Sequence, residues 1–285
     1  MKGRLLVWTV VLCLCAVCAL AACAPVAEKP QEEDQGTLYV AMSYNIRTIA
    51  TDSNPHTWPE RMPKVVAQIT AYRPHLLAMQ EATVLHMMDL TPALEEEYGI
   101  LFTGRETALW AEGNPVLYRL DTFVLVDSGT FWLSETPSEV SKYTGAACYR
   151  ICTWAVLEDI TTGQRLCVAS THLDHESAEA RLFGASVLKQ ELSNEYPLVL
   201  MGDFNESADG VAYASLCERF TDAGSGLNEP SFHGFGSVTE GLPIDFVFVE
   251  GEWTVEDCCI LKESGEGGYT SDHYALLAKL WLQNN

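Results

Sequence analysis

The chain has 285 residues, with 39 acidic and 17 basic residues and a formal net charge of −22 at pH 7. Apolar residues make up 48% of the chain, enough to fill a large core, which excludes an intrinsically disordered protein. The negative charge repels polyanions at long range and disfavours tight nonspecific binding of duplex DNA, although local basic side chains could still hold one phosphate group.

The N-terminal residues have the layout of a secretory signal. Lys2 and Arg4 form a short positive region, and an uncharged run follows from residue 5 to residue 20. The uncharged stretch continues to Ala27, so a membrane anchor is the alternative. The stretch Leu20–Cys23 resembles a bacterial lipobox, in which the chain is cut before the cysteine and its thiol receives lipid.

This resemblance implies an exported lipoprotein, held on the outer side of a bacterial cell membrane by acyl chains on Cys23. The next stretch is rich in acidic residues and contains proline, as expected of a solvated tether. We therefore expect a signal peptide at residues 1–22, the lipidated cysteine and a flexible tether at 23–36, and one folded domain at 37–285.

The folded part begins with an alternating strand-like segment at residues 38–46. Pro59 suits the first turn of a helix that stops before Pro74. Further strands are predicted at residues 75–81, 115–119, 123–134, 151–160, 165–174, 198–205, 244–250, 253–261 and 274–282, and helices at 85–98 and 177–196. A turn at residues 161–164 predicts a hairpin. Strands outnumber helices, which indicates an α/β sandwich with mixed sheets.

The cysteines and tryptophans of this domain are expected to be structural. A domain of this size does not need disulfides, and no CxxC metal spacing occurs, so we expect mostly buried thiols, with a disulfide as the alternative. The residues concerned are Cys148, Cys152, Cys167, Cys217, Cys258 and Cys259, and Trp58, Trp110 and Trp132 are expected to pack in the core.

Several predicted strands end in the same way, with a polar residue directly after an apolar run. The endings read MSYN, AMQE, ASTHLDH, LMGDFN, PIDF and YTSDH. One such ending is an ordinary loop start. Six endings that supply carboxylates, amides and imidazoles indicate convergence on a metal-assisted site at the strand ends.

The residue types fit hydrolysis of a phosphate ester. Oxygen ligands such as Asn45, Glu81 and Asp272 suit a hard cation such as Mg²⁺. The carboxylate of Asp203 could accept a proton from an attacking water molecule.

The histidines add hydrogen-bond donors. His172 and His273 could donate to phosphoryl oxygens as charge develops on them. Asp245 could hold one of the two imidazoles in its cationic form.

The blocks SYNIR, MQE, STHLDH, GDFNE, IDFVFV and SDHY occur in the order and spacing of the endonuclease/exonuclease/phosphatase superfamily, and the chain resembles it from Thr37 to the C-terminus. The resemblance implies the DNase I-like fold, a four-layer α/β sandwich of two mixed β-sheets packed face to face and flanked by helices. The blocks GTFWLSETP, RICTW and SFHGF resemble the bacterial secreted branch, which does not settle the substrate.

The resemblance also implies roles for residues at the matching positions. Glu81 would be the principal Mg²⁺ ligand, supported by Asn45, with Mn²⁺ as a substitute metal. Asp203 would activate or orient the water, and Asn205 would hold the water or a phosphate oxygen.

The two histidines, His172 and His273, would contact the scissile phosphate, with Asp245 orienting His273 and Asp272 binding the metal or supporting a ligand. Arg47 stands where some nucleases of the superfamily have an acid. This difference puts a second metal position in doubt, and Arg47 could instead meet an anionic substrate.

Four further residues have two interpretations each. Asp174 and His175 either touch substrate or brace a loop. Arg181 either contacts substrate or ties a helix to the site loop through a salt bridge. His233 either lines the leaving-group pocket or packs within its own loop.

The leading hypothesis is a monomeric Mg²⁺-dependent phosphoesterase that cleaves a phosphodiester or a phosphomonoester by in-line attack of water. The substrate could be a small phosphate, a phospholipid headgroup or a nucleic acid, and the acidic surface favours the first two at least as much as DNA. A two-metal calcineurin-like phosphatase is disfavoured because no Gly-Asn-His motif occurs. The alternative from another class is an inactive lipoprotein that binds a phosphorylated ligand through the same fold.

Overall fold

The computed structural model describes residues 36–262 and 268–283. The strands are β1 (Thr37–Asn45), β2 (Leu76–Gln80), β3 (Ala82–Thr83), β4 (Tyr98–Leu101), β5 (Glu112–Gly113), β6 (Val116–Arg119), β7 (Phe123–Trp132), β8 (Ile151–Asp159), β9 (Arg165–His172), β10 (Leu198–Asp203), β11 (Thr221–Asp222), β12 (Asp245–Glu250), β13 (Trp253–Leu261) and β14 (Ala275–Leu282). The helices are α1 (Trp58–Tyr72), α2 (Val84–Leu94), α3 (Ala178–Glu191) and α4 (Val211–Leu216), with short 3-10 turns η1 (Ile49–Thr51) and η2 (Gly234–Gly236).

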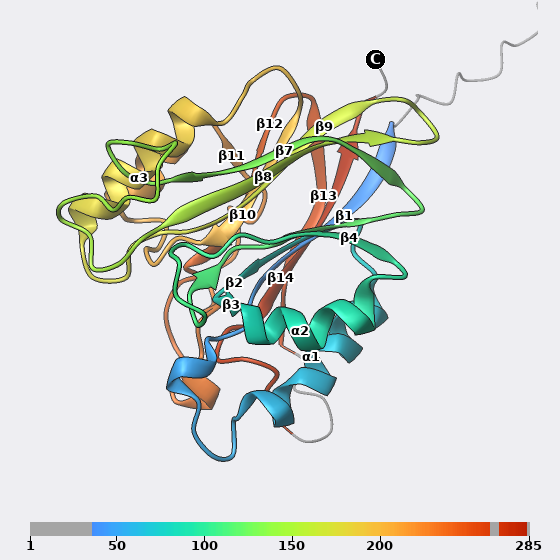
Figure 1. Cartoon of the computed structure of the whole chain (residues 1–285). Helices are drawn as coiled ribbons and strands as arrows, with labels where there is room; N and C mark the ends of the chain where they lie inside the picture. The colour runs from blue at the N-terminus through green and yellow to red at the C-terminus, as the bar shows by residue number, and fades with distance from the viewer. Residues whose placement is uncertain (1–35, 263–267, 284–285) are drawn as a thin grey trace, which may run out of the picture. The chain divides into compact units, whose positions relative to one another are not determined.

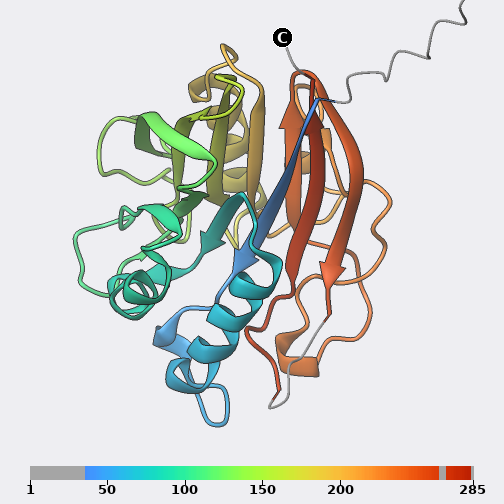
Figure 2. The same ribbon diagram turned by 90° about the vertical axis from the view of Figure 1, so that its right-hand side faces the viewer.

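Two six-stranded sheets pack against each other. The first has the order β13-β14-β1-β2-β6-β4 and the second the order β11-β12-β10-β9-β8-β7. Helices α1 and α2 cover the outer face of the first sheet, and α3 and α4 cover that of the second (Figure 1). The view turned by 90° shows β1, in blue, beside the C-terminal strands of the same sheet, in red (Figure 2). This arrangement confirms the predicted four-layer α/β sandwich.

The central strands are buried on both faces. In β1, Tyr39 and Ala41 point into the core between the sheets, whereas Met42 and Tyr44 point into the core beneath α1 and α2. Such a strand must be almost continuously apolar, since neither face meets water. Polar side chains are therefore placed at the strand ends, which is the pattern seen in the sequence.

The first helix begins and ends as the sequence predicts. Thr57 and Glu60 form a capping box at its start, and Arg73 ends it in the left-handed conformation before Pro74. The predicted hairpin is also present, because β8 and β9 pair in antiparallel fashion. No helix of the described residues is long and apolar enough to cross a membrane.

Some local expectations were wrong. The helix expected to reach Tyr98 ends at Leu94, because Tyr98 begins a strand that pairs with β6. The helix expected to reach residue 196 ends at Glu191. Trp110 is 68% exposed instead of packed in the core. All six cysteines of the domain are free thiols, as expected, but only Cys152 and Cys167 are buried and Cys217 is exposed.

Two pairs of parallel strands determine where the site residues lie. β1 is parallel to β2 in one sheet, and β9 is parallel to β10 in the other. Parallel neighbours end at the same edge of a sheet. The C-terminal ends of these four central strands, two from each sheet, supply Asn45, Glu81, His172 and Asp203.

Candidate active site

Strand register brings three predicted residues together in the second sheet. Asp203 at the end of β10 lies opposite His172 on β9 and opposite Asp245 on β12. In the first sheet, Asn45 lies opposite Gln80, and Glu81 is the next residue along the chain. Hydrogen bonds then join the two sheets, because the Asn45 amide Nδ2 donates to Glu81 Oε1 at 3.1 Å and to Asp203 Oδ2 at 3.0 Å.

The chain turns sharply where it leaves these strands. Arg47 has φ of 56°, Glu81 of 62° and Asn205 of 49°, which is the left-handed region that costs energy for residues other than glycine. Each residue lies one or two positions beyond a strand that carries the site. The strain is concentrated at the place where the side chains must converge.

Gly202 allows β10 to approach its neighbour closely. A Cβ atom at this position would lie 2.3 Å from the carbonyl oxygen of Thr171 on β9. Any side chain would therefore push apart the two strands that hold His172 and Asp203 in register.

Glu81 is held by donors on both of its carboxylate oxygens. Besides the bond from Asn45, the backbone N–H of Thr48 donates to Glu81 Oε2 at 2.6 Å. The amide oxygen of Asn45 accepts from the backbone N–H of Arg47 at 2.9 Å. In this arrangement Asn45 joins the carboxylates of Glu81 and Asp203 through its nitrogen.

His273 is a buried cation. Its Nδ1 lies 2.9 Å from Asp245 Oδ2, and its Nε2 lies 3.7 Å from Asp203 Oδ2. Burial by itself lowers the pKa of His273, but the charges of Asp245 and Asp203 outweigh burial and raise that pKa to about 10. Burial and the charge of Asp245 raise the pKa of Asp203 to about 7.

His172 has the opposite character. Burial, and then the charges of Arg150 and Arg105, hold the pKa of His172 well below its usual value, so its imidazole is neutral at pH 7. Its Nε2 lies 2.8 Å from the Asn205 amide nitrogen, which donates to it. Asp203 therefore lies between a neutral imidazole and a cationic one, an arrangement that separates acid and base roles.

A pocket of about 340 Å³ opens onto these groups. It is lined by Arg47, Thr48, Thr51, Glu81, Arg105, Glu112, Cys148, Arg150, His172, His175, Asp203, Asn205, Phe232, Ile244, Asp272 and His273. Most of the lining residues carry polar or charged side chains, and the volume of the pocket is in the range of small-molecule sites.

Arg150 is the unusual member of the lining. It is 6% exposed, and no carboxylate of the described residues forms an ion pair with it. Its Nη2 lies 3.1 Å from His175 Nδ1, and its buried Nε has no hydrogen-bond partner. A buried guanidinium without an acid is costly, so the site is suited to an anion that enters from solution.

The other two guanidinium groups of the pocket are paired. Arg47 forms an ion pair with Asp272, so this predicted metal ligand is already engaged by a cation. Arg105 Nη1 lies 2.6 Å from Glu112 Oε2.

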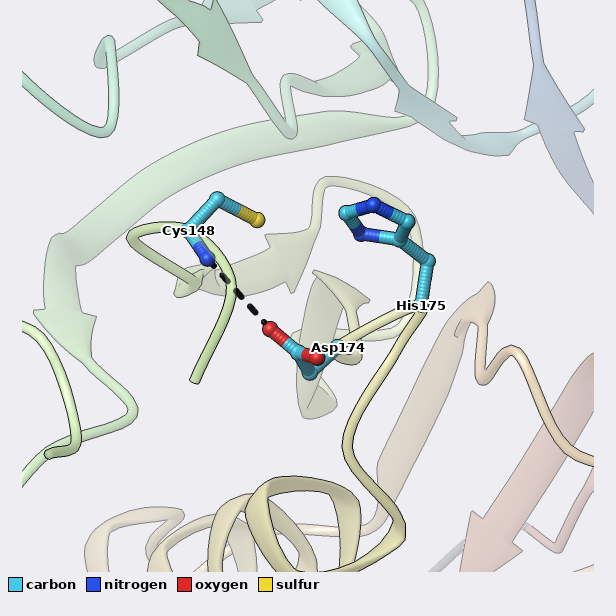
Figure 3. A group of neighbouring side chains, drawn as sticks. All are labelled: Cys148, Asp174 and His175. Atoms are coloured by element: carbon cyan, nitrogen blue, oxygen red, sulfur yellow. Dashed lines mark hydrogen bonds between the residues drawn. The ribbon is translucent and has the colours of Figure 1, made fainter. Parts of the chain in front are cut away.

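Asp174 lies outside the pocket lining and braces loops. Its Oδ2 accepts from the backbone N–H groups of Ala147 and Cys148, and its Oδ1 accepts from those of Glu176 and Ser177. Cys148, Asp174 and His175 come together as a group with metal-ligand atoms (Figure 3). Because four N–H donors already occupy the Asp174 carboxylate, this group is a poor metal site.

Two other predicted residues are also engaged elsewhere. Arg181 Nε donates to Glu206 Oε2 at 2.9 Å, and its Nη1 donates to the Asp174 carbonyl at 3.0 Å, so it ties α3 to the neighbouring loops. The ring of His233 packs against Tyr274 and Tyr269, with centroids 4.0 and 4.5 Å away. Phe232, the neighbour of His233, lines the pocket.

The donor set suits a divalent metal ion. Glu81, His172 and Asp203 form one group of closely spaced ligand atoms, and Asp203, Asp245 and His273 form another. The raised pKa of Asp203 reflects crowded negative charge that a cation would relieve. Carboxylate oxygens fit a hard ion, and Glu81 with Asp203 would hold it between the sheets.

Sequence reasoning did not assign a role to Thr48, Arg105, Glu112 or Arg150. Arg105 and Glu112 lie between β4 and β6, in a segment where the sequence predicted no strand. Arg150 comes directly before a strand, whereas the search concentrated on residues that follow strands.

The geometry agrees with the comparison to known proteins. The model of the Endonuclease/Exonuclease/phosphatase family matches residues 42–273, so the chain belongs to this family of phosphoester hydrolases. A family member from Bacteroides vulgatus is 32% identical, with a TM-score of 0.80, over 86% of this chain and 99% of that one. Another, from Bacteroides thetaiotaomicron, is 25% identical, with a TM-score of 0.81, over 87% and 99%.

A third solved structure shares the fold. It is a mannosyl-6-phosphatase of Bacteroides thetaiotaomicron, 24% identical, with a TM-score of 0.78, over 85% of this chain and 99% of that one. A search of curated proteins found no match.

Proposed function

We propose that the protein is a Mg²⁺-dependent phosphoesterase that hydrolyses a small phosphate ester by in-line attack of water. The observation that carries the proposal is the position of Asp203 between His172 and His273. The side-chain amide of Asn45 links Asp203 to Glu81. No polymer-sized groove is needed, since a pocket of about 340 Å³ accommodates a small ligand.

The residues divide the reaction between them. Asp203 accepts the proton of the attacking water, and Asn205 helps to hold that water. The cationic His273 and the guanidinium of Arg150 donate hydrogen bonds to phosphoryl oxygens as their charge develops. A Mg²⁺ ion held by Glu81 would supply electrostatic stabilisation of the phosphoryl group.

Known structural relatives support a small phosphate ester as the substrate. One neighbour in fold is a mannosyl-6-phosphatase, and another is described as a 2′,3′-cyclic phosphatase. The net charge of −22 also favours a small substrate over a nucleic acid, which a strongly acidic surface repels.

The test is an activity panel with the purified full-length chain and Mg²⁺. Release of phosphate is measured from sugar phosphates, nucleotides, inositol phosphates, phospholipids and nucleic acids, with Asp203→Asn as the inactive control. Hydrolysis of at least one small phosphate ester, abolished by EDTA and by the substitution, is expected. Turnover that survives both treatments would reject the mechanism, and no turnover of any ester would favour the binding-protein alternative.

Export and lipid attachment at Cys23 are a separate part of the proposal, supported by the sequence of residues 1–23. In a bacterial host, labelled fatty acid should be incorporated into the wild-type chain and should be absent from Cys23→Ser. Recovery of equal label in both would reject the lipid anchor.

A further inference from the structure

The Arg105–Glu112 ion pair lines the pocket without a role in the chemistry proposed above. Both side chains are 17% exposed, and the Nη1–Oε2 distance is 2.6 Å. The Nη1 of Arg105 also donates to Cys148 Sγ at 3.7 Å, and the buried Nε has no hydrogen-bond partner. The pair therefore presents a donor and an acceptor side by side.

The backbone around the pair is fixed at several points. The N–H of Arg105 donates to the carbonyl of Glu112 at 2.8 Å, and the carbonyl of Arg105 accepts from the Trp132 indole at 2.8 Å. Glu112 also pairs with Thr83 in the small β3–β5 sheet, two residues beyond Glu81. A pair held in this way is preorganised for binding, since little conformational freedom remains to be lost.

The charge pattern indicates what the pair can recognise. A second anionic group would be repelled by Glu112 and by the neighbouring Glu81, whose charge contributes to raising the pKa of Glu112 after the larger effect of burial. The lining offers a flat aromatic group only the apolar side chains of Cys148, Phe232 and Ile244, and Phe232 already packs on the His273 ring at 5.0 Å. A hydroxyl group, which both donates and accepts, fits both members of the pair.

We propose that Arg105 and Glu112 form a subsite for hydroxyl groups of the leaving alcohol, so that the substrate is the phosphate ester of a sugar or another polyol. This inference rests on the proposed phosphoesterase activity and adds its specificity. Glu112 accepts a hydrogen bond from one hydroxyl, and Arg105 donates to the same hydroxyl or to its neighbour on the ring.

The experiment compares substrates that share a phosphate and differ in hydroxyl groups. The purified full-length chain with Mg²⁺ is assayed on mannose 6-phosphate, glucose 6-phosphate and inositol 1-phosphate, and on methyl phosphate and phenyl phosphate, which lack other hydroxyls. We expect kcat/KM for at least one polyol phosphate to exceed that for methyl phosphate by at least about tenfold.

Variants then locate the preference. Glu112→Gln removes the acceptor charge at constant size, and Arg105→Lys keeps the ion pair but loses the planar fork. Each is expected to lower kcat/KM for the preferred polyol phosphate by about 10- to 100-fold, mainly through KM, and to change kcat/KM for methyl phosphate by less than about threefold. Retained activity on methyl phosphate also shows that the variants are folded. Glu97→Gln, which breaks the exposed Arg73–Glu97 pair, is the matched control and should change neither value.

The outcomes separate the two proposals. If the wild type hydrolyses methyl or phenyl phosphate as well as it hydrolyses every polyol phosphate, the subsite is rejected and the phosphoesterase activity stands. Equal losses on both substrate types in Glu112→Gln and Arg105→Lys, or no loss in either, would also reject the subsite. If the wild type hydrolyses no phosphate ester, the proposed function itself fails.

Discussion

Asp203 and Asp245 lie directly opposite each other at the ends of the antiparallel strands β10 and β12. Two buried carboxylates in this position repel each other, and the repulsion adds to burial in raising the pKa of Asp203 to about 7. His273 contacts both acids and is held as a cation by them. The three groups share charge as one unit, so each substitution among them affects the other two.

Replacing Asp203 should remove the proposed base without harming the fold. Asp203→Asn is expected to lower kcat by about 10²- to 10⁴-fold. Because one of two like charges is removed, the free energy of unfolding of the metal-free protein at neutral pH should not fall. Phosphate release and urea denaturation measure the two quantities, with the exposed Asp209→Asn as control. Turnover within tenfold of wild type would contradict the assignment.

Arg150 and Arg181 should respond in opposite directions to the same substitution. Arg150→Met removes a buried charge that has no acid partner, so the free energy of unfolding should rise by roughly 1 kcal/mol or more. Arg181→Met leaves the carboxylate of Glu206 unpaired and should cost roughly 2–4 kcal/mol. Only Arg150→Met should weaken inhibition by inorganic phosphate, by about 10- to 100-fold. A destabilised Arg150→Met with unchanged phosphate inhibition would show that this side chain is structural.

His273 should make stability depend on pH. Its pKa in the folded protein is about 10, against 6.5 as the ordinary value, so the folded state binds the proton more tightly than the unfolded chain does. The resulting stability is fully present below pH 6.5 and is lost as the pH rises towards 10. In EDTA, the difference in free energy of unfolding between wild type and His273→Gln should shrink steadily across this range. A difference that is constant with pH would mean that His273 is neutral.

Metal binding should be visible as stability and should depend on Glu81. At a Mg²⁺ concentration one hundred times the dissociation constant, the free energy of unfolding should rise by about 2.7 kcal/mol. Glu81→Gln should lose most of this increase, whereas Glu158→Gln in the exposed pair with Arg165 should retain it. Thermal unfolding with and without Mg²⁺ is the measurement. An equal Mg²⁺ effect in both variants would place the ion elsewhere.

The contact at Gly202 predicts that even a methyl group is harmful. Gly202→Ala places a Cβ against the Thr171 carbonyl oxygen and should cost about 1–3 kcal/mol of stability. Activity should also fall, because β10 carries Asp203. Gly226→Ala is the control, since a Cβ there meets nothing within 4 Å. A Gly202→Ala protein with wild-type stability and activity would show that the strands separate freely.

The sequence predicted the centre of the site well because the signal there is physical. A strand that is buried on both faces has no room for polar side chains except at its ends, and parallel neighbours end together. Asn45, Glu81, His172 and Asp203 all follow this rule and all line the pocket or bond to residues that do. The six endings were therefore more informative together than any of them alone.

The sequence was less informative where contacts are local or irregular. Asp174 and Arg181 have polar side chains next to the site, but both already have partners. The Asp174 carboxylate accepts from backbone N–H groups, and the Arg181 guanidinium forms an ion pair with Glu206. Conversely, Glu112 reaches the pocket from a segment where the sequence predicted no strand, through pairing with β3. Residue type alone does not reveal which hydrogen-bonding groups are already occupied.

The register of β10 has a consequence for how activity can be lost. A slip of one residue between β10 and β12 would set Phe246 opposite Asp203 and turn the side chains of one of the two strands to the wrong face of the sheet. The relative positions of the catalytic side chains therefore depend on the pairing of the strands that carry them. Inactivation by heat should then coincide with cooperative unfolding of the sandwich, because the catalytic residues cannot separate while the strands remain paired.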